Sequence, residues 1–131
     1  ESRRRKDLSS RIGRREGHCF RKGKTTVAYA AIVFDKDPYY EHIDGRWLSD
    51  GEPYVAVHRV AVHDDWLRNG VARNALHYAE RAAARRGVGW FRIDTHHDNR
   101  PMRDLLRTSG FTFCGVVQVR DGMRMAYEKR I

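Results

Sequence analysis

Apolar and polar residues alternate along this chain in a way that predicts a protein of strands and helices. Short runs rich in β-branched and aromatic residues predict strands, at Gly17–Arg21, Thr26–Phe34, Tyr54–His63, Trp90–Thr95, Phe111–Val119 and Met123–Lys129. Turn residues at Lys22–Lys24 and at Asp121-Gly122 join neighbouring runs, so both pairs are predicted to form β-hairpins. The run at Tyr54–His63 is so apolar that we expect it in the centre of a sheet.

Two stretches have helical periodicity. Val71–Arg86 carries a single apolar stripe, and Gly87 suits the position after a helix. The stripe consists of Val71, Ala72, Ala75, Leu76, Ala79, Ala82 and Ala83. A second helix is predicted to begin after a cap at Asp98 or Asn99 and to end at Gly110. Between the strands, Asp35–Pro53 is expected to be a long loop with at most one helical turn, and loops of this length often carry function.

Composition narrows the class of protein. The chain has 131 residues, 40% of them hydrophobic, which suits one domain with its own core. No apolar run approaches the ~20 residues that cross a bilayer, so we expect no membrane association. The two cysteines, Cys19 and Cys114, form no CxxC pair, and a cytoplasmic location with reduced thiols is the simplest interpretation.

The charge is strongly basic and unevenly spread. The net charge is +9 and the pI about 10.1. Much of it lies in the first two dozen residues. We expect residues 1–16 to be a basic segment, either disordered or the remnant of a helix around Asp7–Arg15. Such a charge suits either nucleic acid or a small polyanionic cofactor. Because no aromatic residues are interleaved with the basic run and no recognition motif is present, nucleic acid is disfavoured.

A phosphate site is predicted where the Tyr54–His63 strand leads through a short polar turn into the first helix. The turn ends in Arg68-Asn69-Gly70-Val71-Ala72, which aims backbone N–H groups and the positive end of a helix dipole at one point. Gly70 allows close approach of a phosphate, and Ala72 is too small to block it. Arg68 and Arg73 add charge. No Gly-Lys-Ser/Thr follows, and G-x-G-x-x-G is absent, so neither a Walker nor a Rossmann site is indicated.

These motifs together resemble the GNAT acetyltransferases over residues 17–130. The order of strands, the loop ending in Gly-Val-Ala, and Asn99 opening a helix that ends in Ser109-Gly110-Phe111 carry the resemblance, and RIDTHHDNRPMRDLL resembles one bacterial branch. It implies a single α/β domain over residues 1–131. Its sheet would be mixed, mostly antiparallel and twisted, flanked by helices, with splayed central strands forming the acetyl-CoA cleft. The cofactor-binding residues that it implies are Val60, Ala61, Val62, Leu67, Arg68, Asn69, Gly70, Val71, Ala72, Arg73, Asn99 and Arg103.

The chain also departs from the family pattern. The Gln or Arg that begins the family loop is Leu67 here. The tyrosine that protonates the leaving thiolate in many relatives is Leu106, and a glutamate base of some relatives falls at Ala56. Relatives usually have a strand and two helices before the first hairpin, so the wall they form at the acceptor site is either missing from this sequence or supplied by a partner chain.

Among the remaining residues, His58 is the best candidate base for deprotonating an amine. Strand alternation would place it on one face with Ala56, Val60 and Val62, and a purely structural histidine is the alternative. Asp94 and His96 are second candidates at the end of a neighbouring strand. His96-His97-Asp98 suggests a metal site, but adjacent side chains on a strand or loop tend to diverge, so we expect no metal. Trp47, Tyr39 and Tyr40 would either line an acceptor pocket or pin the long loop to the sheet.

The resemblance implies an N-acetyltransferase that moves an acetyl group from acetyl-CoA directly to a primary amine of a small molecule or peptide. The absent tyrosine and glutamate motivate a second hypothesis, a coenzyme A-binding module without turnover. A basic nucleic-acid-binding domain is the third. A homodimer is expected only by analogy with relatives.

Overall fold

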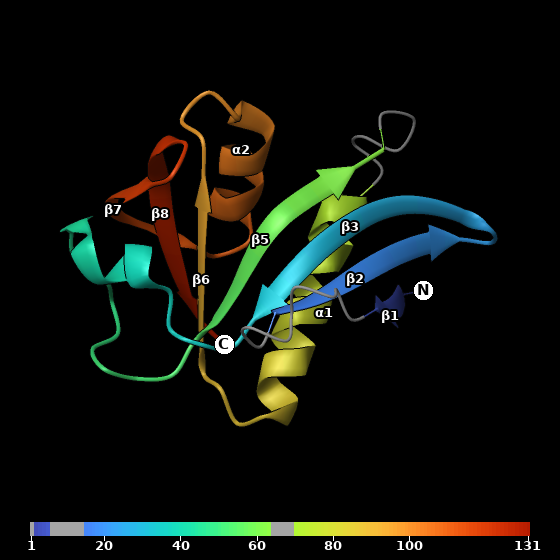
Figure 1. Cartoon of the computed structure of the whole chain (residues 1–131), viewed down its shortest axis with the longest axis horizontal. Helices are drawn as coiled ribbons and strands as arrows, with labels where there is room; N and C mark the ends of the chain where they lie inside the picture. Colours follow the sequence, from blue (N-terminus) through green and yellow to red (C-terminus); the bar gives the residue numbers. More distant parts are fainter. Residues whose placement is uncertain (1, 6–14, 64–69) are drawn as a thin grey trace.

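The computed structural model describes residues 2–5, 15–63 and 70–131. In this part of the chain, eight strands form one sheet in the order β1-β2-β3-β5-β6-β8-β7-β4 (Figure 1). The strands are β1 (Ser2–Arg5), β2 (Arg15–Lys22), β3 (Thr25–Val33), β4 (Asp44–Gly45), β5 (Val55–Val62), β6 (Trp90–Thr95), β7 (Thr112–Val119) and β8 (Gly122–Arg130). The helices are the 3₁₀ turn η2 (Pro38–His42), α1 (Val71–Arg85) and α2 (Arg100–Thr108).

The centre of the sheet is where two parallel strands meet and then part. All neighbouring strands pair antiparallel except β5 and β6. That parallel pair extends only over Val55–Val57 and Phe91–Ile93. Beyond these residues the two strands diverge, as the green and orange arrows in Figure 1 show. The predicted mixed, mostly antiparallel sheet with splayed central strands is therefore confirmed.

A β-bulge in β5 changes which residues share a face. Ala31 lies opposite His58, but Tyr29 lies opposite Ala61, so β5 has one residue more than β3 in this interval. Arg59 lies in the bulge and has a φ of 56°, a left-handed conformation that is uncommon outside glycine. As a result Val60 and Val62 pack on the face of Val55 and Val57, towards the helices. The prediction that they share a face with His58 was wrong, because strict alternation does not survive a bulge.

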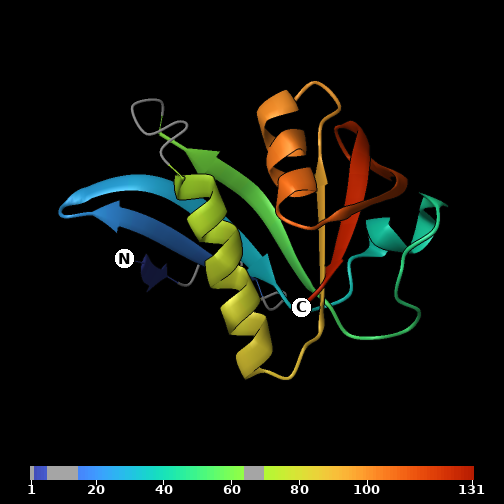
Figure 2. The same cartoon turned by 180° about the vertical axis from the view of Figure 1, so that it is seen from behind.

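Both α-helices cover one face of the sheet. Seen from behind, α1 lies across β3 and β5 (Figure 2). Its buried residues Val71, Ala75, Leu76, Ala79 and Ala83 pack with Leu106 of α2 in the larger core cluster. The predicted stripe is thus confirmed, with the half-buried Ala72 and Ala82 at its margins. Small alanine side chains let α1 pack close to the strands, and burying its apolar face drives that packing.

The opposite face is covered by the long loop before β5. A second cluster there joins residues of the loop to the central strands. Its buried members are Tyr40, Tyr54, Ala56, Val117 and Ala126. The predicted loop contains one helical turn, η2, as expected, and also the two-residue strand β4, which pairs with β7. The loop is therefore a packed layer of the fold.

The N-terminal segment is the main correction to the predicted elements. Ser2–Arg5 form β1, which pairs antiparallel with Gly17–Phe20, and β2 begins at Arg15. These parts are neither disordered nor helical, because β1 extends the hairpin of β2 and β3 at its edge. Most of the helix predicted around Asp7–Arg15 lies outside the described residues. Neither α-helix of the described chain has the length and apolarity that a bilayer crossing requires.

Candidate active site

His58 and Asp94 occupy the first positions after the parallel strands part. Val57 and Ile93 are the last pair of β5 and β6, and the two residues follow directly on them. Both side chains emerge on the face away from α1, because Val57 and Ile93 belong to the core under the helices. Nδ1 of His58 lies 4.0 Å from Oδ2 of Asp94, and the side chains are 20% and 13% exposed. Two predicted catalytic residues are thus brought together at the divergence of the sheet.

A third residue of this cluster comes from the long loop. Oδ2 of Asp37 lies 3.1 Å from Nε2 of His58. The carboxylate is held by its own turn, since Oδ1 accepts a hydrogen bond of 2.9 Å from the backbone N–H of Tyr39 and caps η2. The backbone N–H of Asp37 donates to the hydroxyl of Tyr54 at 2.7 Å. Sequence reasoning missed Asp37. Its signal was the Asp-Pro pair that starts η2.

Tyr40, a buried residue of η2, contacts Asp94 through a hydrogen bond. Its hydroxyl donates to Oδ2 of Asp94 at 2.6 Å, and the residue is 1% exposed. Burial, followed by the negative charge of Asp94, raises the pKa of Tyr40 well above its usual value, so the hydroxyl remains a donor. Nε1 of Trp47 donates to the carbonyl oxygen of Tyr40 at 2.8 Å. Of the two alternatives for these aromatics, Tyr40 and Trp47 pin the loop to the sheet, whereas Tyr39 is 42% exposed.

A buried ion pair fastens the other end of the loop. Glu128 of β8 is fully buried and accepts from Nε of Arg92 at 2.9 Å. It also accepts from the backbone N–H of Leu48 at 2.7 Å, from that of Ser49 at 3.0 Å, and from the Ser49 hydroxyl. The Arg92 guanidinium stacks on the rings of Trp47 and Tyr54, 4.2 and 4.3 Å from their centroids. The loop that carries Asp37 and Tyr40 is therefore fixed against the sheet at both ends.

The predicted phosphate-binding turn leads into α1 as expected. Gly70 has a φ of 75° and stands at the N-cap position, with no side chain capping the helix. The backbone N–H groups of Val71, Ala72 and Arg73 have no acceptor within the helix, and its first turn contains no acidic residue. This is the arrangement that binds anions at helix N-termini. Leu67, Arg68 and Asn69 of the predicted loop lie outside the described residues.

The other predicted cofactor residues in this region are Val60, Ala61 and Val62 of β5 and Arg73 of α1. Val60, Ala61 and Val62 form the part of β5 beyond the divergence, where the edge turned towards β6 pairs with no strand in the described chain. Nη1 of Arg73 donates to the hydroxyl of Ser109 at 3.3 Å. The start of α1 thus lies next to the end of α2, and the edge of β5 that pairs with no described strand begins where the parallel pair ends.

On α2, both predicted residues have structural partners. Oδ1 of Asn99 accepts from the N–H of Met102 at 3.2 Å, which confirms the predicted helix cap. Nη1 of Arg103 donates to the carbonyl oxygen of His97 at 3.0 Å, and its Nε lies 3.5 Å from the hydroxyl of Tyr127. These contacts fix the start of α2 beside β8. Contact of Asn99 or Arg103 with a cofactor stays a prediction.

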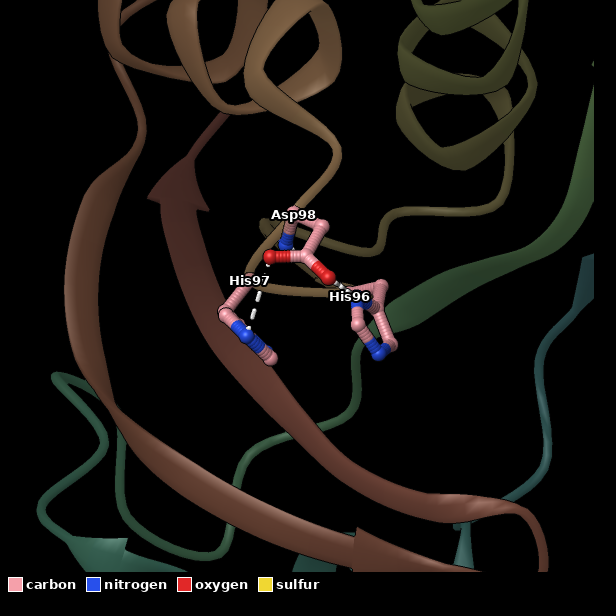
Figure 3. A group of neighbouring side chains, drawn as sticks. All are labelled: His96, His97 and Asp98. Carbon is pink, nitrogen blue, oxygen red and sulfur yellow. Dashed lines mark hydrogen bonds and ion pairs between the residues drawn. The ribbon is translucent and has the colours of Figure 1, made fainter.

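His96, His97 and Asp98 form a separate, exposed cluster after β6 (Figure 3). The histidine rings stack with their centroids 4.5 Å apart, and Asp98 reaches His97 Nε2 at 3.0 Å and His96 Nδ1 at 3.6 Å. The expectation that these side chains diverge was wrong, because the chain turns here instead of continuing as a strand. Of the three predicted catalytic residues, His58 and Asp94 lie together. The third, His96, contacts His97 and Asp98 instead. The backbone N–H of Asp98 already donates to His96 Nδ1 at 3.1 Å, and the absence of a metal stays a prediction.

Comparisons with known proteins agree with this geometry. The family model described as "Acetyltransferase (GNAT) family" matches residues 2–111. The mycothiol acetyltransferase of Thermobifida fusca is 36% identical over 74 residues, which are 53% of this chain and 22% of that protein. A GNAT-family acetyltransferase from Streptococcus agalactiae superposes with a TM-score of 0.76 at 29% identity, covering 88% of this chain and 65% of that one.

A GNAT-family acetyltransferase from Elizabethkingia anophelis, solved with acetyl-CoA bound, has the same fold. Its TM-score is 0.69 at 11% identity, and the match covers 89% of this chain and 76% of that one. This chain spans less than a quarter of the curated relative and about two thirds of the Streptococcus structure. Because the family model covers most of the sequence, the chain belongs to the GNAT acetyltransferase family.

Proposed function

We propose that this domain transfers the acetyl group of acetyl-CoA directly to a primary amine. The observation that carries the proposal is the pairing of His58 with Asp94 at the divergence of β5 and β6. A base and a carboxylate at this point suit an acceptor that arrives as an ammonium ion and must lose a proton before it attacks. Family membership supports acetyl-CoA as the donor.

The donor is proposed to bind with its pyrophosphate at the N-terminus of α1. The N–H groups of Val71, Ala72 and Arg73, which have no acceptor within the helix, and the charge of Arg73 are suited to that role. The thioester would then extend along the part of β5 beyond the divergence, towards His58. There a backbone N–H of β5 would donate to the oxygen that becomes negative when the amine attacks.

The proposed reaction is one displacement without an acyl-enzyme. The amine nitrogen forms a bond to the acetyl carbon, the carbon–sulfur bond breaks, and the electron pair leaves with the sulfur. His58 takes one proton from the ammonium ion before the attack and passes it on to water. The second proton leaves the nitrogen after the new bond has formed and is proposed to go to the thiolate, so that the products are the amide and free coenzyme A. Leu106 is fully buried in the core, so the position that carries a tyrosine in many relatives offers no proton here.

A specific observation favours the second candidate, a coenzyme A-binding module without turnover. The positions that carry a glutamate base or a tyrosine acid in some relatives are Ala56 and Leu106 here, and neither side chain can give or take a proton. Both are fully buried. Such a module would keep the α1 site and lack acetyl transfer. The His58–Asp94 pair argues for the enzyme, because binding coenzyme A through phosphates requires neither group.

The test is a steady-state assay of thiol release from acetyl-CoA with a panel of primary amines, including short peptides, each product being confirmed by mass spectrometry. We expect amine-dependent release of free coenzyme A and a product heavier by one acetyl group. Binding of coenzyme A by calorimetry, with no turnover for any amine, would favour the module instead.

A further inference from the structure

We propose that the ammonium group of the acceptor binds between Nδ1 of His58 and Oδ2 of Asp94, and that Asp37 keeps Nδ1 as the proton-accepting nitrogen. We name these two atoms the ammonium seat. The inference rests on the proposed acetyl transfer and assigns the acceptor's binding point, together with a positioning residue that lies outside the family's motifs.

The tautomer of His58 follows from its contact with Asp37. An ionised carboxylate only accepts hydrogen bonds, so Nε2, which lies 3.1 Å from Asp37 Oδ2, must carry the hydrogen. A neutral imidazole has a single N–H, and Nδ1 is therefore left with its lone pair. That nitrogen is the one that faces Asp94. The carboxylate of Asp37 also stabilises the imidazolium that forms when His58 takes a proton.

Asp37 is fixed in position by several contacts, so it can determine which nitrogen of His58 carries the hydrogen. Its side chain is 12% exposed, and its other oxygen, Oδ1, is occupied by the N–H of Tyr39. The backbone N–H of Asp37 donates a hydrogen bond to the hydroxyl of Tyr54. The Arg92–Glu128 pair fixes the far end of the same loop. Asp37 therefore reaches His58 from a packed layer of the fold, which is what a positioning residue requires.

The distance between the two atoms of the seat suits a bridging group. At 4.0 Å, His58 Nδ1 and Asp94 Oδ2 are too far apart for a direct hydrogen bond. A nitrogen about 2.9 Å from each fits between them, since two such bonds span more than that separation. Both side chains are partly exposed, so a ligand can reach them. Tyr40 orients Asp94 from the buried side.

The charges around the seat favour a cation. Among the described residues, the titratable groups in contact with His58 are Asp37 and Tyr40 from the η2 segment and Asp94 of β6. Tyr54, before β5, contacts Asp37 in turn. The nearby charge of Arg92 is matched by Glu128. Two carboxylates, those of Asp37 and Asp94, thus border the imidazole. An ammonium ion binds at Asp94, an N–H bond breaks as Nδ1–H forms, and the electron pair stays on the amine nitrogen for the attack.

The first test reads the tautomer directly and needs no activity. Long-range ¹H–¹⁵N spectra of the wild-type protein, at a pH at which the ring is neutral, are expected to show His58 with its hydrogen on Nε2. In Asp37→Asn the side-chain amide keeps an oxygen for Tyr39 and can place its NH₂ against Nε2, so the hydrogen should move to Nδ1. An Nδ1–H tautomer in the wild-type protein would overturn the proposal.

The second test uses kinetics with the amine that the assay identifies. Asp37→Asn should lower kcat by about 10²-fold, because the base is lost, and should leave the KM for acetyl-CoA unchanged. Asp94→Asn should raise the KM for the amine by about tenfold, a loss of one charge-assisted contact. The matched control is Asp50→Asn, which removes an exposed carboxylate from the same loop and should change neither constant.

A double variant separates positioning from a general effect on the fold. In a His58→Gln background, Asp37→Asn should lower kcat no further, because Asp37 acts through His58. An equal loss in both backgrounds would contradict the proposal. If no amine is acetylated at all, the proposed function fails. The spectra still decide whether Asp37 sets the tautomer, so the two failures are distinguishable.

Discussion

Arg92 and Glu128 lie side by side on neighbouring strands and form an ion pair 2.9 Å long that is almost completely removed from water. Burying two charges costs free energy, which this pair recovers only through its further bonds to Leu48 and Ser49. Its structural consequence is the attachment of the long loop to the sheet. The positions of Asp37 and Tyr40 over His58 and Asp94 therefore depend on a contact that lies outside the candidate site.

Glu128→Ala tests this attachment. The change leaves Arg92 as an unpaired buried charge and orphans two backbone N–H groups, so we expect a loss of about 3–5 kcal/mol in the free energy of unfolding. Urea denaturation measures it. The control is Glu80→Ala, which removes the partner of Lys129 from a less buried pair at 3.0 Å and should cost no more than about 1 kcal/mol. Equal losses in the two variants would show that the pair does not hold the loop.

Gly70→Glu tests the proposed phosphate site. Apart from its chain neighbours, a Cβ at Gly70 would meet no atom of the described residues within 4 Å, so the expected cost to stability is the strain of a φ of 75°, about 1–2 kcal/mol. The new carboxylate would repel a phosphate, and we expect calorimetry to show at least a tenfold loss of affinity for coenzyme A.

Gly51→Glu is the matched control for that variant. Gly51 has a φ of 70° and equally open surroundings, so the backbone strain is the same. Its affinity for coenzyme A should equal that of the wild-type protein. If both variants bind coenzyme A as the wild type does, the helix N-terminus is not the phosphate site.

Tyr40 links stability to high pH. Its pKa is raised in the folded state by burial and by Asp94, so the unfolded chain loses the proton first. The stability that Tyr40 contributes is complete below the unfolded pKa of about 10 and is lost as the pH rises through the folded value. We expect Tyr40→Phe to be less stable than wild type at pH 8, because Asp94 loses its donor, and to lose less stability between pH 9 and 11. Tyr39→Phe, at an exposed position, should follow the wild-type pH profile.

Local patterns were enough to predict most of the fold. The hairpin turns, the alanine stripe of α1 and the Asn99 cap each depend on residues close in the sequence, and each is confirmed. The divergence of the central strands followed from the family resemblance. Periodicity alone does not predict how far two parallel strands stay paired.

The partners of His58 were not predictable in the same way. Asp37 and Tyr40 lie in an aperiodic loop whose path is fixed by contacts with Glu128, about eighty residues later in the chain. A charged residue in a strand normally indicates an exposed position, so Glu128 gave no sign of its burial. The bulge at Arg59 reversed the faces of Val60 and Val62, and nothing in their residue types indicates an inserted position.

The most direct test of the account compares His58→Gln with His77→Gln in the acetyl-transfer assay. His77 is an exposed residue of α1, whereas His58 lies at the divergence of the strands. We predict that His58→Gln lowers kcat by about 10²-fold or more while the KM for acetyl-CoA stays constant, and that His77→Gln changes neither. An unchanged kcat in His58→Gln across the pH range would contradict the assignment of His58 as the base.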